Sequence, residues 1–286
     1  MSAALRVPSE DDASDVARLF SEGAPEPVDR ASVLREWNFP GVQITNDARL
    51  GDGSYAFVDS FGDGRVWISL AGEPSAELLD WAEARARELG SRMLSGAWVS
   101  KEAIIRDLER RGFWLVRSAH RMVIDLGDTG ASPPIWPPDV EARAFEPGDE
   151  QVFYDLHQET FGDSWEPLEE TYEQWAHQFL APGVLDPALW TLASVGDEPV
   201  GLAICHPHAV DAELGWVRVL GVRRSHRARG IGRALLLRAF EQFRDRGRTR
   251  VGLGVDATSP TGANRLYESV GMREYARFAI LEKDAE

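Results

Sequence analysis

The chain has 286 residues and a mass of 31.7 kDa, a length that fits about two domains. Its composition, with 43% hydrophobic and 27% charged residues, is that of a globular protein and excludes a disordered or fibrous one. The formal net charge of −16 argues against a general nucleic-acid-binding protein, because such proteins neutralise phosphates with Lys and Arg.

Apolar spacing and turn residues predict the elements of the first half in chain order. Helices are expected near residues 15–22 and 32–36, followed by a meander of strands to residue 70. A longer helix over 76–89 comes next, then a strand, a short helix and further strands. This order of elements predicts a mixed α/β unit.

A segment rich in Pro, Gly and small residues follows the first half. It runs from Gly127 to Pro134 and continues with Pro137 and Pro138. Such composition is typical of connections between domains. The sequence therefore predicts a first domain over 1–128, a linker over 129–138 and a second domain over 139–286.

The second half has the same order of expected elements. Strands are predicted over 140–145, 189–194, 199–205, 214–222 and 251–255, with one or two more over 273–282. Helices are predicted over 149–161, 168–180 and 262–270. The strongest helix is expected over 230–246, because its apolar residues repeat at intervals of three and four along one side.

The two halves also match each other in sequence. Trp67 and Gly72 correspond to Trp216 and Gly221 at an offset of 149, and later pairs match at offsets of 157 and 159. The second copy has therefore gained about eight residues after Gly221. We predict an α/β fold with a mixed sheet, used twice, and expect the chemistry where the second copy is longer.

The longer segment contains a turn of the sequence Arg-Ala-Arg-Gly-Ile-Gly-Arg, residues 227–233, between an expected strand and the long helix. A helix N-terminus offers unpaired N–H groups and the positive end of the helix dipole. Glycines let the main chain approach an anion, and arginines suit phosphate. These features predict a pyrophosphate site. The spacing differs from the G-x-G-x-x-G pattern of dinucleotide-binding folds.

Two motifs together resemble a known family. Leu220-Gly221-Val222 followed by Arg227-x-x-Gly230-x-Gly232 resembles motif A of the GNAT acetyltransferases. Residues 259–272, with Leu266-Tyr267 and Gly271, resemble their motif B. The resemblance covers the second half, and the first half resembles a degenerate copy. The chain is thus similar to tandem GNAT proteins such as the mycothiol synthases, which implies two tandem GNAT-like domains.

The resemblance implies that acetyl-CoA is the co-substrate and that no metal is needed. The pantetheine arm would follow Leu220, Gly221 and Val222, in a place where the family opens its central strands. The cofactor's remaining contacts would come from Arg227, Ala228, Arg229, Gly230, Ile231, Gly232, Arg233 and Asn264. Tyr267 falls where the family keeps the general acid that protonates the departing thiolate.

The sequence departs from the family pattern at two places. Ser259 or Pro260 stands near the usual position of the motif B asparagine, and Asn264 lies further along. On the strand where the mycothiol synthases have a carboxylate, the alignment gives Trp216. Glu213 is the candidate general base, with Asp211, Asp256 and a water relay as alternatives.

The first half lacks the turn of the second. It has Gly72-Glu73-Pro74-Ser75 at the corresponding place, where Glu73 would repel a phosphate, and Leu108 corresponds to Tyr267. We therefore expect the first domain to bind no CoA and to perform no chemistry.

The charge is distributed in blocks. Residues 136–217 contain one basic and 17 acidic residues, whereas residues 218–250 contain 11 arginines and only two acidic residues. A basic segment at the phosphate turn beside an acidic segment predicts a small, cationic primary amine as the acceptor. The predicted function is N-acetyl transfer from acetyl-CoA by direct transfer in a ternary complex.

Three other functions fit the same motifs. The first is acetylation of a cysteinyl amino-sugar, as in a mycothiol synthase. The second is a non-catalytic acyl-CoA-binding protein or sensor, and the third is a protein N-terminal acetyltransferase with an open peptide groove.

The remaining features predict a simple setting for the reaction. The single cysteine, Cys205, excludes an intramolecular disulfide, and Cys205-His206-Pro207-His208 is interpreted as a turn rather than a metal site. No secretory signal and no run of 18 apolar residues is found in the sequence. We expect a cytoplasmic monomer or homodimer that has no nucleic-acid or membrane partner.

Overall fold

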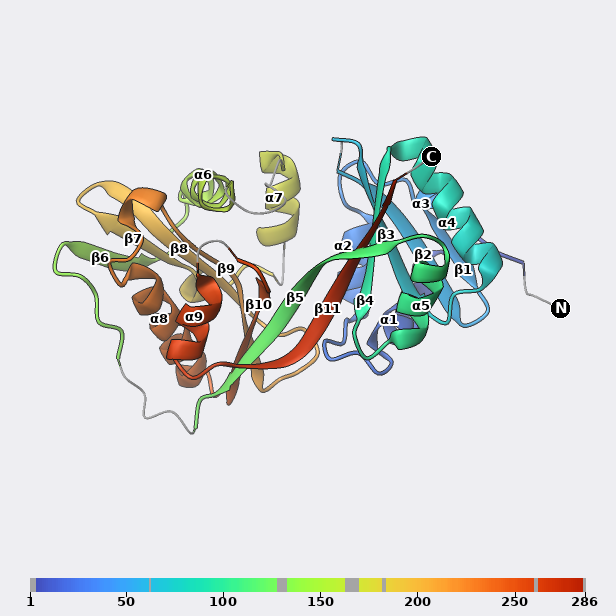
Figure 1. Ribbon diagram of the computed structural model, residues 1–286. Coiled ribbons are helices and arrows are strands. Elements are labelled where there is room, and N and C mark those ends of the chain that lie inside the picture. The colour runs from blue at the N-terminus through green and yellow to red at the C-terminus, as the bar shows by residue number, and fades with distance from the viewer. Residues whose placement is uncertain are drawn as a thin grey trace. The chain divides into compact units, whose positions relative to one another are not determined.

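The computed structural model describes residues 4–61, 63–127, 133–162, 170–181, 184–259 and 262–284. By their internal contacts the residues divide into two compact units (Figure 1). Unit 1 comprises Met1–His120, Asp256–Thr258 and Ala276–Glu286, and unit 2 comprises Arg121–Val255 and Ser259–Tyr275. The sequence predicts a linker at residues 129–138, of which 129–132 lie outside the described residues. The division by contacts differs from that prediction: unit 2 begins at Arg121, and the last residues of the chain belong to unit 1.

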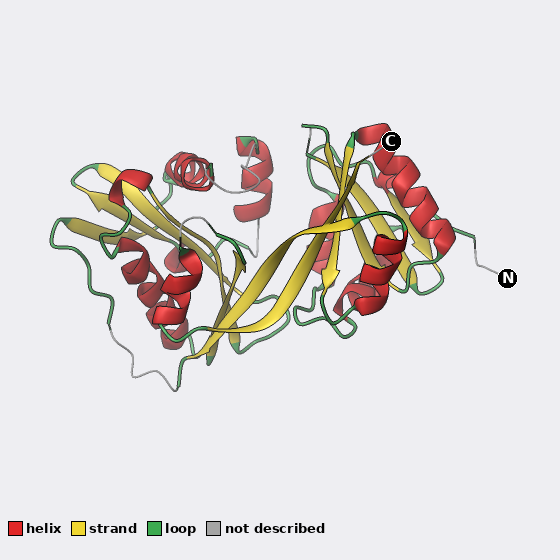
Figure 2. Ribbon diagram, viewed as in Figure 1, coloured by secondary structure: helices red, strands yellow, loops and turns green. Residues whose placement is uncertain are grey.

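Unit 1 contains short helices around a small sheet (Figure 2). Its helices are η1 (Glu10–Asp12), α1 (Ala13–Ser21), α2 (Arg30–Trp37), α3 (Ile44–Asp47), α4 (Ala76–Leu89) and α5 (Glu102–Arg110). Its strands are β1 (Ala48–Gly51), β2 (Ser54–Ser60), β3 (Arg65–Gly72), β4 (Arg92–Trp98) and the first part of β5 (Trp114–Asp125). The last part of β11 (Arg273–Asp284) completes the order β1-β2-β3-β4-β11.

The sheet of unit 1 is covered on both faces, because successive side chains of a strand point to opposite sides. Ala56 and Val58 of β2 belong to the apolar cluster that α4 covers. Tyr55 and Phe57, the alternating residues, belong to a second cluster with α1 and α2. The strand is therefore apolar along its length, as expected for a strand between two layers of helices.

Unit 2 has the same mixed α/β composition (Figure 2). Its helices are α6 (Glu150–Phe161), α7 (Tyr172–Phe179), η2 (Pro187–Leu189), η3 (Arg224–His226), α8 (Ile231–Asp245) and α9 (Ala263–Ser269). Its strands are β6 (Val140–Ala144), β7 (Thr191–Val195), β8 (Glu198–Pro207), β9 (Leu214–Val222) and β10 (Arg250–Asp256). With the last part of β5 they follow the order β5-β10-β9-β8-β7-β6.

Helices α6 and α7 lie on one side of the sheet of unit 2, and α8 and α9 lie on the other (Figure 1). Between the layers, one continuous apolar core includes Trp175 of α7 and Phe243 of α8, both fully buried. The predicted helix over 230–246 is confirmed as α8, and the predicted strand over 214–222 is confirmed as β9. The mixed α/β fold expected from the sequence is likewise confirmed.

The match between the two halves is visible in the strand register of the two units. In unit 1, β3 pairs parallel with β4 through four residues, Arg65–Ile68 against Arg92–Ser95. In unit 2, β9 pairs parallel with β10 through four residues, Leu214–Val217 against Arg250–Leu253. Trp67 and Trp216 occupy the third pair in each ladder, which confirms their alignment at an offset of 149.

Candidate active site

The site begins where two parallel strands of unit 2 separate. The ladder between β9 and β10 ends at the pair of Val217 with Leu253, whereas β9 continues to Val222 beside its other neighbour, β8. Main-chain groups of Leu220 and Val222 that face β10 are therefore outside the ladder. An opening of this kind offers peptide N–H and C=O groups to an extended ligand that contains amides.

A β-bulge lies at the same point of β9. Val219 is the partner of Ile204 and Val217 is the partner of Cys205, so Arg218 is an extra residue in the strand. A bulge changes which side the following side chains face. A Cβ at Gly215 would meet Phe243 of α8 at 2.4 Å, whereas one at Gly221 would meet Thr160 of α6 at 2.3 Å. The bulge thus re-aims the part of β9 that borders the opening.

The predicted phosphate turn forms an array of bare N–H groups after β9. None of the N–H groups of residues 228–233 donates to a carbonyl of the described chain, and the first helical bond of α8 comes from Ala234 to Gly230. Ala228 and Gly230 both have positive φ, 61° and 89°, which gives the turn its tight curvature. Consecutive free N–H groups at a helix N-terminus bind anions, so the turn fits a pyrophosphate.

The arginines of the turn occupy defined positions. Arg227 folds back onto the strand, where its Nε donates to the carbonyl of Val222 at 3.0 Å. Arg229 is held by Asp139 at 2.6 Å. Arg233 lies in the first turn of α8. Arg227 therefore ties the turn to the end of β9, and the guanidinium groups add positive charge beside the N–H array.

Helix α9, which contains Tyr267, packs beside this turn. A Cβ at Gly232 would lie 3.5 Å from Leu266 and 3.6 Å from Val222, so α8, α9 and β9 meet at the glycine. Tyr267 is 7% exposed, and Asn264 lies in the first turn of the same helix. Burial raises the pKa of the Tyr267 phenol to about 12, so it is protonated at neutral pH and can donate a proton.

The candidate bases lie elsewhere. Glu213 precedes β9, roughly 20 Å along the strand from Leu220. It accepts from Thr249 at 3.3 Å, and Arg250 binds the neighbouring Asp211 at 2.7 Å. Asp256 is bound by Arg117, and by its contacts it belongs to unit 1. Glu213 and Asp211 therefore lie at the start of β9, whereas the turn follows the end of that strand.

Two arginines that the sequence analysis did not single out flank Trp216. Arg218 donates to the side-chain oxygen of Gln178 at 2.5 Å and lies 4.1 Å from the ring centre of Phe179. Arg121 lies over the Trp216 ring at 6.0 Å and against Gly254 of β10. These groups place positive charge beside the end of the β9–β10 ladder.

Part of the acidic segment is neutralised within unit 2. Arg223 binds Glu159 at 3.0 Å and Glu198 at 2.9 Å, and Arg143 binds Asp149 at 2.5 Å. Asp163, Glu166 and Glu169, which belong to the same segment, lie outside the described residues. Among the described residues, the acidic segment therefore contains several carboxylates that are already paired with arginines.

A buried histidine in α6 is expected to make unit 2 sensitive to acid. His157 of α6 is 4% exposed, and its Nδ1 accepts from Trp175 Nε1 at 3.1 Å. Burial, and secondarily repulsion from Arg218, lowers the pKa of His157 to about 4. Protonation would also remove the acceptor that Trp175 uses.

This pKa predicts how stability changes with pH. An unfolded histidine binds a proton below about pH 6.5 and the folded one only near pH 4, so His157 reduces the stability of unit 2 by about 2 kcal/mol between pH 7 and pH 5. We expect His157→Gln to lose less stability over that range than the wild type. Urea midpoints measured by tryptophan fluorescence at both pH values test this, and equal losses in the two proteins would contradict it.

Comparison with known proteins identifies the family. The model of the acetyltransferase (GNAT) family matches residues 151–272, which contain β9, the turn, α8 and Tyr267. A mycothiol acetyltransferase of Thermobispora bispora is 32% identical over 229 residues, which are 74% of this chain and 77% of that protein. The chain belongs to the GNAT family of acetyltransferases. It is an N-acetyltransferase by that membership.

Solved structures extend the similarity to both units. A GCN5-related N-acetyltransferase of Sphaerobacter thermophilus is 30% identical, with a TM-score of 0.79 over 99% of this chain and 96% of that one. A tandem GNAT protein from the clavulanic acid biosynthesis pathway is 12% identical, with a TM-score of 0.71 over 100% and 98% of the two chains. The second likeness shows the fold alone, and it supports two tandem GNAT-like domains.

The described residues contain neither a membrane-spanning helix nor a cluster of metal-ligating side chains. No described helix is both long and apolar enough to span a bilayer. In the same part of the chain, no group of three or more His, Cys, Asp or Glu side chains gathers as metal ligands do.

Proposed function

We propose that the chain transfers an acetyl group from acetyl-CoA to a small primary amine, directly and within a ternary complex. The observation that carries the proposal is the array of free N–H groups at residues 228–233, which adjoins the strand opening and the helix of Tyr267. Members of the GNAT family use acetyl-CoA, and an N–H array of this kind suits its pyrophosphate.

Each part of the site has a distinct task in this reaction. The turn, with Arg227, Arg229 and Arg233, would hold the pyrophosphate, and Leu220 to Val222 would pair with the amides of the pantetheine arm. The amine nitrogen attacks the thioester carbonyl, the carbon–sulfur bond breaks, and the sulfur takes the proton of the Tyr267 hydroxyl. The attacking nitrogen loses one proton to solvent or to a base reached through water, and one proton returns from solvent to the Tyr267 phenolate, which restores the acid.

The proposed acceptor is cationic. Asp155 of α6 and Glu173 of α7 are exposed carboxylates of the acidic segment over residues 136–217. An ammonium substrate would be attracted by them, and salt would weaken this attraction. The Trp216 ring beside the opening supplies an apolar surface on which the carbon skeleton of a small amine can pack.

A cysteinyl amino-sugar is the second candidate acceptor. It is favoured by the relatives named mycothiol acetyltransferase, of which one is 32% identical over most of both chains. Trp216, at the position where the sequence comparison expects a carboxylate, argues against it.

The test is release of free thiol from acetyl-CoA with a panel of amines: a polyamine, an aminoglycoside, a cysteinyl amino-sugar, a neutral primary amine and a peptide N-terminus. We expect turnover with a small cationic amine and a KM for it that rises with salt. Equal, salt-independent activity on neutral and polycationic amines would refute the cationic acceptor. Absence of turnover with every amine, together with tight acetyl-CoA binding, would identify a binding protein instead.

A further inference from the structure

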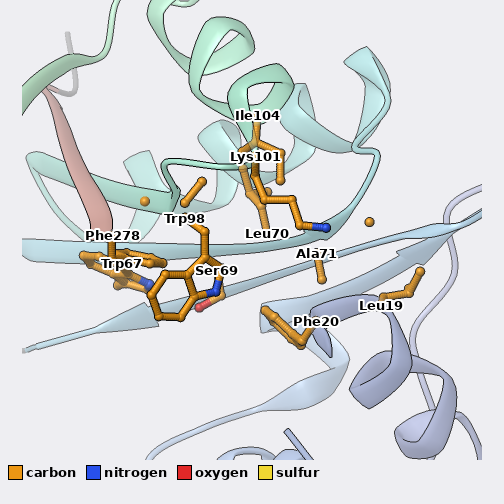
Figure 3. A pocket seen from close by; sticks show the side chains of 13 residues that line it. Leu19, Phe20, Trp67, Ser69, Leu70, Ala71, Trp98, Lys101, Ile104 and Phe278 are labelled. Atoms are coloured by element: carbon orange, nitrogen blue, oxygen red, sulfur yellow. The ribbon is translucent and has the colours of Figure 1, made fainter. Parts of the chain in front are cut away.

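A pocket in unit 1 lies where β3 and β4 separate (Figure 3). Their ladder ends at the pair of Ile68 with Ser95, and beyond it Ser69–Gly72 and Gly96–Trp98 line the pocket. The buried Ser95 hydroxyl donates to the carbonyl of Ile68 at 2.8 Å, which satisfies the last carbonyl of the ladder from within. The opening is thus a built feature of the sheet.

The outer neighbours of both strands hold this opening apart. Residues 69–72 of β3 pair with β2, and residues 96–98 of β4 pair with β11. A Cβ at Gly96 would lie 2.4 Å from Phe278, so the phenyl ring rests directly on the β4 main chain. The pocket is open to solvent at its mouth, and about 490 Å³ of empty space lies within it when that mouth is included.

Aromatic side chains form much of the wall. The ring of Phe278 stacks with that of Trp67 at 6.4 Å and meets that of Trp98 edge-on at 5.2 Å. Phe20 of α1 lies across the pocket from them in the view of Figure 3. All four side chains are only partly buried, so their ring surfaces remain open to a ligand. Such a wall favours a flat, apolar group.

Two polar side chains reach the same pocket, Lys101 and Ser69. The Lys101 ammonium donates to the carbonyl of Glu22, and no ion pair joins it to a carboxylate of the described residues. An ammonium has three donors, so others are open to an anion. A cation without a carboxylate partner, beside an apolar wall, is complementary to a ligand with one negative charge.

The adjoining helix N-terminus disfavours a pyrophosphate. The side chain of Ser75 caps α4 by accepting from the N–H of Leu78 at 3.2 Å, and Glu73 and Glu77 place carboxylates beside that end of the helix. Like charges repel a phosphate there. In unit 2 the corresponding turn has bare N–H groups and three arginines. The pocket therefore suits a smaller anion than CoA.

We propose that this pocket is a second ligand site, separate from the acetyl-transfer site, which binds a small aromatic monocarboxylate. Its ring lies among Phe20, Trp98 and Phe278, and its carboxylate accepts from Lys101 and Ser69. Unit 1 then binds a ligand of its own and no CoA.

The test is calorimetric titration of the full-length chain with benzoate, phenylacetate and indole-3-acetate, and with neutral phenylacetamide. We expect at least one acid to bind at one site per chain and about tenfold more tightly than the amide. Lys101→Met should remove this preference and leave amide binding unchanged. Arg106→Met, which removes an exposed charge from α5, the helix that follows Lys101, should leave both unchanged. Ser69→Ala should weaken acid binding alone.

A second titration separates this pocket from the acetyl-transfer site. Acid binding should be the same with and without saturating acetyl-CoA. The proposal is overturned if no acid binds at millimolar concentration, if acid and amide bind equally, or if acetyl-CoA displaces the acid. Two CoA sites per chain, one of them lost in Lys101→Met, would overturn it as well and would assign the pocket to CoA.

Discussion

Replacing Tyr267 by phenylalanine is expected to lower kcat about 100-fold and to leave the KM for acetyl-CoA nearly unchanged. The phenyl ring keeps the apolar contacts of a side chain that is 7% exposed, so the fold of α9 is retained. Only the proton for the departing thiolate is lost. Steady-state thiol release, with the amine that the panel identifies, measures both constants.

Tyr55→Phe is the matched control. Tyr55 is also a buried tyrosine, and its hydroxyl accepts from Trp37 Nε1 at 2.7 Å, but it lies in the core of unit 1. The control should reduce the stability of unit 1 without a change in kcat. Equal falls in kcat for both variants would show that loss of a buried hydroxyl, and not loss of the acid, causes the effect.

The pH dependence gives a second test of the same assignment. Because burial raises the pKa of Tyr267 to about 12, the phenol remains protonated through pH 10. Below pH 10, deprotonation of Tyr267 should therefore cause no fall in the wild-type kcat. Any fall in kcat with rising pH in this range should be present in Tyr267→Phe as well. A basic limb near pH 8 that is present only in the wild type would contradict the role of Tyr267 as the acid.

The elements around the turn could be predicted because their signals are local. The apolar periodicity of α8 and the glycines at 230 and 232 belong to one short segment, and the structure has the helix beginning at Ile231. The alignment of Trp67 with Trp216 likewise depends on short matches, and both residues occupy the third pair of their ladders. Such features need no knowledge of distant contacts.

The features that escaped prediction depend on pairing between distant segments. The bulge at Arg218 is a one-residue shift in the pairing of β8 with β9. Neither strand contains a residue from which the bulge could be predicted. Arg121 reaches Trp216 from β5, almost a hundred residues earlier in the chain. Glu213 is only seven residues from Leu220 in sequence, but the two residues lie far apart because the strand between them is extended.

The division of the chain into units is a further case. A composition rich in Pro and Gly marks residues 127–138 as a connection, and this part of the signal is local. The sequence does not indicate that Phe278–Asp284 pair with β4 of the first half. A strand that completes the sheet of another unit is determined by register and burial, and single-sequence patterns contain neither.

Gly230→Asp is expected to raise the KM for acetyl-CoA about 100-fold. Gly230 has a φ of 89°, and a Cβ built there meets no atom within 4 Å, so a side chain would extend into open space beside the N–H array. A carboxylate at that position repels a pyrophosphate at short range. The carboxylate also competes with the phosphate, because it can accept hydrogen bonds from the free N–H groups of residues 228–233.

Gly230→Asn is the matched control, because asparagine and aspartate have nearly the same shape and both tolerate positive φ better than other side chains. The strain of the turn is thus common to the two variants, and only the charge differs. Calorimetric titration with acetyl-CoA should give a large loss of affinity for Asp and a small one for Asn, with a gap that narrows as salt is added. If Asp and Asn weaken binding equally at low salt, backbone strain accounts for the effect, and the turn at 228–233 does not hold the phosphates.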